Sequence, residues 1–148
     1  MNTLSAPQAI LLIGGLTHFA ISAMAGYMLY WLRARDLKAA MSPYAIITHR
    51  STLINGCVNI GLAVAIQYTN FIPAIAIGLA AAAVLASMLS DLKNIMNWWK
   101  GHTDALAQDS PTGLRMRGLA NMLNTIVVFA LLYGVARSAL VAAGVLPN

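Results

Sequence analysis

Four long, predominantly apolar stretches separated by short polar segments constrain this chain more than any other feature. The first, residues 9–32, contains no Asp, Glu, Lys or Arg. A helix of that length reaches about 36 Å, more than the roughly 30 Å hydrocarbon core of a bilayer. The other three stretches are residues 44–68, 73–99 and 113–144. We therefore expect an all-α integral membrane protein, an antiparallel four-helix bundle that forms a single domain over residues 1–148.

The charge content agrees with a lipid environment. Only 9% of the residues are charged, whereas a soluble domain carries roughly a quarter. The net charge of +5 does not indicate nucleic-acid binding, because the basic residues form no stripe with interleaved aromatics. The single cysteine, Cys57, excludes an intrachain disulfide and a cysteine-based metal cluster.

Lysine and arginine are distributed unevenly between the two sides of the predicted bundle. The side with Arg137 has no other basic residue, and the opposite side has eight, namely Arg33, Arg35, Lys38, Arg50, Lys93, Lys100, Arg115 and Arg117. Basic residues accumulate in cytoplasmic loops. This bias predicts a bacterial inner-membrane protein with the first and third loops cytoplasmic and both termini outside.

Polar residues gather toward the predicted cytoplasmic ends of three of the predicted helices. Each set recurs at helical spacing and would form one seam. The residues are His49, Thr52, Asn55 and Asn59 on the second helix, Ser87, Asp91, Asn94 and Trp98 on the third, and Arg117, Asn121 and Asn124 on the fourth. Polar groups in hydrocarbon must find partners, so we expect these seams to face one another around a polar pocket.

Single Asn, Ser and Thr residues in membrane helices often only bridge neighbouring helices, whereas a buried ionisable residue is usually functional. His49, flanked by the asparagines, is therefore the main candidate site residue. His18 has only Ser22 as a polar neighbour at helical spacing, so we interpret it as a structural residue. We interpret His102 as a solvated loop residue. No Ser-His-acid arrangement, phosphate loop or CxxCH motif is evident. Haem b needs one axial histidine and apolar walls, a role open to His49.

Two short segments carry a family resemblance. Residues 48–56 (THRSTLING) resemble the His-(five residues)-Asn-Gly element of styrene oxide isomerase and of membrane-bound hydroxylaminobenzene mutases. Residues 94–98 (NIMNW) resemble the Asn-rich end of the third helix in the same proteins. The resemblance implies an isomerase that opens an epoxide to an aldehyde or converts an aryl hydroxylamine to an aminophenol. Its small apolar, commonly aromatic, substrate would enter from the bilayer.

The resemblance also assigns roles to individual residues. It implies that His49 ligates the iron of haem b, that Asn55 orients the substrate oxygen and that Asn94 assists. It further implies a homotrimer with haem near the subunit contacts. The epoxide branch has Tyr where Trp98 stands, and its Asp maps to Ser90, beside Asp91. We include Asp91 and Trp98 among the candidate catalytic residues and leave the substrate class open.

Three other functions remain as alternatives. A proton-coupled small transporter needs a deep carboxylate, and the chain has no Glu, while Asp91 is expected close to the interface. A membrane cytochrome would need two axial ligands, for which His18 and His49 are the candidates. An accessory subunit of a larger membrane complex is the third alternative.

Overall fold

The computed structural model describes residues 4–36, 41–104 and 110–147, and within these ranges the protein is all-α. Four long helices and one 3₁₀ turn follow one another in the order α1 (Ala6–Arg35), α2 (Pro43–Ala65), η1 (Ile66–Tyr68), α3 (Pro73–Trp99) and α5 (Pro111–Ala142). The predicted all-α class is confirmed, and the helix bounds differ from the expected ones by only a few residues.

Proline marks the start of every long helix. A proline in the first turn lacks only an N–H that would have no helical partner there. These prolines are Pro7, Pro43, Pro73 and Pro111. At α5 the preceding Ser110 also caps the helix, since its Oγ accepts a hydrogen bond of 3.1 Å from Gly113 N. Local sequence therefore defines where the helices begin.

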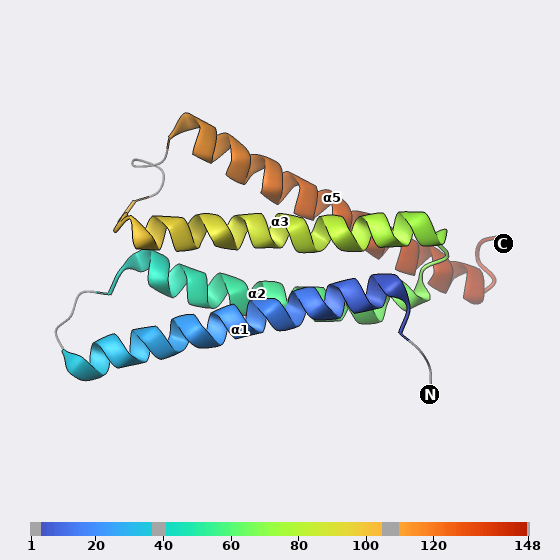
Figure 1. Ribbon diagram of the computed structural model, residues 1–148. Coiled ribbons are helices and arrows are strands. Elements are labelled where there is room, and N and C mark those ends of the chain that lie inside the picture. Colours follow the sequence, from blue (N-terminus) through green and yellow to red (C-terminus); the bar gives the residue numbers. More distant parts are fainter. Residues whose placement is uncertain (1–3, 37–40, 105–109, 148) are drawn as a thin grey trace.

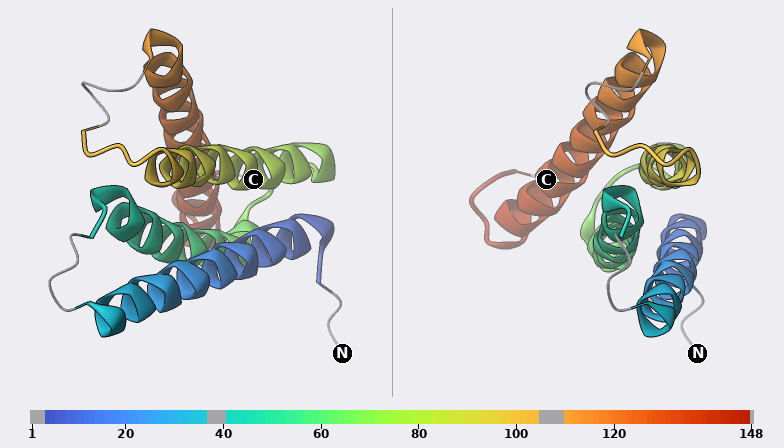
Figure 2. Two further views of the ribbon diagram at one scale, coloured as in Figure 1. Left: turned by 60° about the vertical axis from the view of Figure 1, so that its left-hand side comes forward. Right: turned by 90° about the vertical axis from the view of Figure 1, so that its left-hand side faces the viewer.

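Helices α1, α2 and α3 pack against one another, and Figure 1 shows them running side by side in alternating directions. Helix α5 contacts mainly α3 and crosses it obliquely, so that its N-terminal half stands away from the other helices (Figures 1 and 2). Of the residues of α5, only Ala120, Val127, Leu131 and Gly134 are buried. The molecule is thus a group of three closely packed helices with α5 leaning on the third.

Small residues let these helices approach closely. A Cβ atom at Gly56 of α2 would lie 3.2 Å from the carbonyl oxygen of Gly15 and 2.6 Å from the Phe19 ring, both on α1. On α3 the buried face is a stripe of alanines, comprising Ala76, Ala80, Ala83 and Ala86. Small residues at helix contacts are typical of helix association in lipid.

The outer surface is strongly apolar. Large side chains at least 60% exposed include Ile13, Leu16, Met24, Leu85, Phe129 and Tyr133. Helices α1, α3 and α5 are each long and apolar enough to cross a membrane. Helix α2 has 23 residues but carries His49, Arg50, Asn55 and Asn59 along its length.

Candidate functional site

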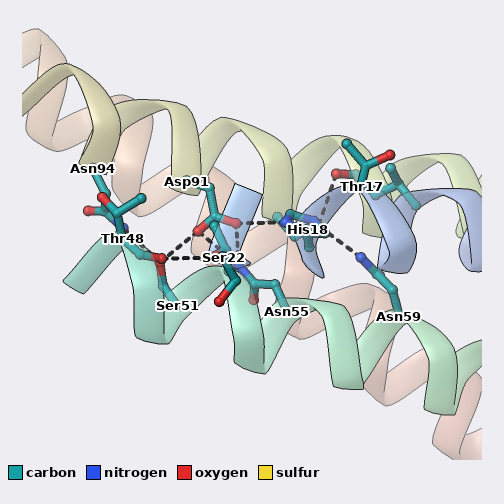
Figure 3. A network of polar contacts seen from close by, with 12 residues as sticks. Thr17, His18, Ser22, Thr48, Ser51, Asn55, Asn59, Asp91 and Asn94 are labelled. Atoms are coloured by element: carbon teal, nitrogen blue, oxygen red, sulfur yellow. Dashed lines mark hydrogen bonds and ion pairs between the residues drawn. The ribbon is translucent and has the colours of Figure 1, made fainter. Parts of the chain in front are cut away.

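A buried network of polar side chains connects α1, α2 and α3 (Figure 3). We call it the polar cluster, and it consists of His18 from α1, Ser51, Asn55 and Asn59 from α2, and Ser87, Asp91 and Asn94 from α3. Figure 3 shows six of these side chains pointing toward one another from the three helices, those of His18, Ser51, Asn55, Asn59, Asp91 and Asn94. The predicted convergence of the second and third helices is therefore present, with α1 as their partner.

Asp91 is the centre of the polar cluster and is only 1% exposed. Its Oδ1 accepts hydrogen bonds from Ser51 Oγ at 2.8 Å and from Asn55 Nδ2 at 3.2 Å. Its Oδ2 is 3.2 Å from the same Asn55 nitrogen and 2.7 Å from His18 Nδ1. A carboxyl group in so apolar a setting needs such partners, because an unpaired buried charge is strongly destabilising.

His18 is fully buried and uses both ring nitrogens. Nδ1 faces Asp91, and Nε2 lies 2.8 Å from Ser87 Oγ. The Ser87 hydroxyl donates its single hydrogen to the carbonyl oxygen of Val84 and accepts from Asn59 Nδ2, so it also accepts from His18 Nε2–H. His18 Nδ1 and Asp91 Oδ2 lie 2.7 Å apart, close enough to share a proton.

The role of His18 corrects two sequence-based readings. His18 is not an isolated structural residue of α1, and serine, histidine and acid do come together, as Ser87, His18 and Asp91. This arrangement differs from a hydrolytic triad, in which the histidine accepts the serine proton. Here that proton goes to Val84 O, and Ser87 is only 5% exposed. The geometry is suited to holding a proton on the His18–Asp91 pair rather than to activating a nucleophile.

His49 lies outside the polar cluster, on the side of α2 that faces α1. Its Nδ1 is 2.9 Å from the carbonyl oxygen of Ser22 and 3.1 Å from Ser22 Oγ. The neighbouring Gly26 makes room for the ring, since a Cβ there would lie 3.0 Å from His49 Cε1. Among the described residues no hydrogen bond joins His49 to Asn55 or Asn94. The expected grouping of His49 with the asparagines is therefore not what the structure shows.

The environment of His49 nevertheless fits an axial ligand. A carbonyl oxygen on Nδ1 selects the Nδ1–H tautomer and leaves the Nε2 lone pair available to a metal, the usual arrangement for a ligating histidine. The imidazole is half-buried. In the described part of the chain, no group of three or more His, Cys, Asp or Glu side chains could hold a metal ion. Haem needs one such ligand, and His49 has the chemistry for it.

The remaining predicted site residues lie on α3 and on α5. Asn94 is buried and donates to Ser51 Oγ at 3.3 Å, while its Oδ1 has no partner in the described structure. Trp98 is half-buried at the end of α3 and takes no part in the hydrogen bonds of the polar cluster. On α5, the predicted seam is half-buried or exposed and makes no hydrogen bond to the cluster, at Arg117, Asn121 and Asn124. The expectation that the seam on the fourth long helix, α5, closes the pocket is wrong, because α5 leans away from the other helices at that end.

Asp91 also forms part of the wall of an apolar groove between α1 and α3. The groove has a volume of about 250 Å³ and is open at the surface. Its other walls are apolar, formed by Ile21 of α1 and by Leu85, Met88, Leu89, Leu92 and Ile95 of α3. The groove is almost wholly apolar, and the Asp91 carboxyl group lies behind its wall, where it is bonded to the polar cluster.

Comparison with models of protein families, with characterised proteins and with solved structures finds no match to this chain.

Proposed function

We propose that this protein is an integral membrane isomerase that rearranges a small apolar, commonly aromatic, molecule. The substrate is an epoxide converted to an aldehyde or an aryl hydroxylamine converted to an aminophenol. The observation that carries the proposal is the buried His18–Asp91 pair, of which Asp91 is also a lining residue of an apolar groove. The motifs at residues 48–56 and 94–98 support the same reaction class.

An intramolecular rearrangement suits this site because it needs no second substrate. The C–O or N–O bond must be polarised and broken with its electron pair going to oxygen, and a cationic centre must be kept from water. The His18–Asp91 pair can donate its proton to the departing oxygen and accept a proton back at the end of the reaction, as in general acid–base catalysis. Asn55 donates to both Asp91 oxygens, and in the proposed reaction its amide orients the substrate oxygen.

Haem b is the cofactor that the proposal includes, and His49 would hold it through Nε2. When bound, haem would supply a Lewis acid for a substrate oxygen. His49 is half-buried and contacts α1, so the proposed haem would lie at the outer surface of the α1–α2 pair. That location agrees with a homotrimer in which haem lies near the subunit contacts.

The proposal also includes an arrangement in the membrane. We propose that all four long helices span a bacterial inner membrane, with the first and third loops cytoplasmic. Helix α2 carries Ser51, Asn55 and Asn59, whose side chains donate hydrogen bonds to α3 rather than facing lipid. Satisfied polar groups are tolerated at membrane depth.

The reaction class is tested with purified protein in lipid vesicles and a substrate that carries ¹⁸O at its reacting oxygen. Each of the two substrate classes is supplied in turn without any added cosubstrate. We expect a product of unchanged mass that retains the label, because the reaction is intramolecular. Incorporation of oxygen from solvent water would indicate hydrolysis, and no turnover of either class would contradict the proposal.

A proton-coupled transporter is the second candidate, because the His18–Asp91 pair is buried and can exchange a proton. Paired ionisable groups inside membrane helices are typical of proton relays. Asp91 lies eight residues, about 12 Å, before the end of α3, deeper than the interfacial position expected from sequence. Proton release from vesicles on addition of substrate would favour transport over isomerisation.

A bis-histidine cytochrome is disfavoured, since both ring nitrogens of His18 are engaged in contacts with Ser87 and Asp91.

A further inference from the structure

Three buried polar atoms at one end of the polar cluster have no hydrogen-bond partner among the described residues. They are Thr48 Oγ1 of α2 and Asn94 Oδ1 and Asn97 Nδ2 of α3. The three side chains are at most 2% exposed. Buried polar atoms in folded proteins nearly always have a partner, because an unpaired one carries the full cost of its desolvation. The three atoms therefore point to a small bound partner.

The contacts of Ser51 show that Thr48 and Asn94 lie close together. Ser51 Oγ is 3.3 Å from the carbonyl oxygen of Thr48 and 3.3 Å from Asn94 Nδ2. In Figure 3, Thr48 and Asn94 lie at the same end of the network. Asn97 follows Asn94 by three residues on the same buried face of α3. Because α2 and α3 run in opposite directions, Thr48, one turn before Ser51, lies level with the turn from Asn94 to Asn97 (Figure 1).

The hydrogen-bonding character of the three atoms identifies the partner. The Ser51 hydroxyl has one hydrogen, and two of its contacts, Asp91 Oδ1 and the carbonyl oxygen of Thr48, are acceptors. Ser51 Oγ therefore accepts from the Asn94 amide nitrogen, which leaves Asn94 Oδ1 as an acceptor. Asn97 Nδ2 is a donor, and the Thr48 hydroxyl can donate or accept. Such a set matches a water molecule, which donates two hydrogen bonds and accepts two.

We propose that Thr48, Asn94 and Asn97 bind a buried water molecule through which Asp91 exchanges its proton with solvent at this end of the helices. Buried waters typically make about three hydrogen bonds to polar groups that otherwise lack partners. In the exchange, Ser51 passes its hydrogen to Asp91 and takes one from the bound water, which takes one from solvent.

The buried face of α3 provides the direction of this route. Asp91, Asn94 and Asn97 follow one another at steps of three residues, about 4.5 Å along the helix axis, and Asn97 lies two residues before the helix ends. Polar side chains thus continue from Asp91 to the end of α3 without an apolar turn between them. The water site rests on these side chains and does not depend on the isomerase proposal.

The water site is tested by NMR of the full chain in lipid bilayers, with asparagine side chains labelled with ¹⁵N. We expect magnetisation transfer from water to the Asn97 Nδ2 protons, although this side chain is only 1% exposed. Asn59 is the internal control, because it is 2% exposed and its Nδ2 donates to Ser87 Oγ. Asn97→Leu assigns the Asn97 signal. No transfer to Asn97, or equal transfer to Asn97 and Asn59, would overturn the proposal.

Thr48→Val and Thr52→Val are a matched pair for the proton route. Both threonines are fully buried on α2, but Thr52 Oγ1 already donates to the carbonyl oxygen of Thr48 at 2.7 Å. Thr48→Val should abolish water transfer to Asn97 and slow the proton exchange of Asp91 about ten-fold, the equivalent of roughly one lost hydrogen bond. Thr52→Val should change the rate by less than about two-fold, because such a bond within a helix adds little.

The exchange rate is read from the infrared band of the Asp91 carboxyl group after a jump in pH, and the loss of this band in Asp91→Asn assigns it. Thermal melting checks that each variant is folded. An unchanged rate in Thr48→Val, or an equal loss in Thr52→Val, would contradict the route. Neither measurement uses turnover, so the result is separate from that of the isomerase proposal.

Discussion

Asp91→Asn is expected to lower turnover at least a hundred-fold while leaving the helices folded. The asparagine Oδ1 can still accept from Ser51 and Asn55, and its Nδ2 can donate to His18 Nδ1. The hydrogen bonds therefore survive, but the proton shared between the carboxyl group and the imidazole is lost. Loss of a general acid typically costs about 10²- to 10⁴-fold in rate. Initial rates in lipid vesicles, normalised to folded protein, measure the effect.

Asp36→Asn is the control for this prediction. Asp36 is an exposed aspartate that ends α1, far along the chain from the polar cluster. Its substitution should leave turnover within about two-fold, as for a surface change. Wild-type turnover in Asp91→Asn would show that Asp91 only holds the helices together.

The second large effect concerns haem. His49→Ala is expected to remove the Soret band of the purified protein completely, since His49 Nε2 is the proposed iron ligand and Ser22 O holds the ring by Nδ1. His49→Gly with added imidazole should restore part of the band, because the small molecule can take the place of the lost ring. The visible spectrum of each variant, per mole of protein, is the measurement.

His102→Ala is the matched control and should keep the full band, since His102 follows the end of α3 outside the helix. An unchanged band in His49→Ala would place the ligand elsewhere. A colourless wild-type protein with activity would remove haem from the account and leave acid–base rearrangement by Asp91 and His18.

Much of the helical framework could be predicted from the sequence. Long apolar stretches located every long helix, since this signal is local. The spacing of Ser87, Asp91 and Asn94 also placed them correctly on one buried face of α3. Helical periodicity carries this information because all three residues belong to the same helix.

The position of α5 could not be predicted in this way. Periodicity gives a face of a helix but not its tilt. The tilt depends on contacts such as that at Gly134, where a Cβ would lie 2.7 Å from the Phe71 ring. Because α5 crosses α3 obliquely, Asn121 and Asn124 stay away from the polar cluster. The wall of the pocket that was predicted from the fourth helix is provided by α1 instead.

The partners of His18 could not be predicted, because they lie far along the chain. Ser87 is 69 residues away, and no spacing rule connects the two. One signal was available in the sequence, namely that His18 and Asp91 are isolated ionisable residues of opposite type in strongly apolar helices. Such residues usually pair, because either one alone would be costly to bury. His49 was placed with the asparagines because it lies at the edge of their arc, where the packing of α1 decides its neighbour.

The central claim is that His18 and Asp91 act as one proton-holding pair, and a double-mutant cycle on turnover tests it most directly. Rates of His18→Gln, Asp91→Asn and the combined variant are compared in vesicles at equal amounts of folded protein. We predict that each single change lowers the rate to a similar extent and that the combined variant is no slower than either, since the pair is already broken. Wild-type turnover in His18→Gln, or losses that multiply in the combined variant, would contradict a shared role for the two residues.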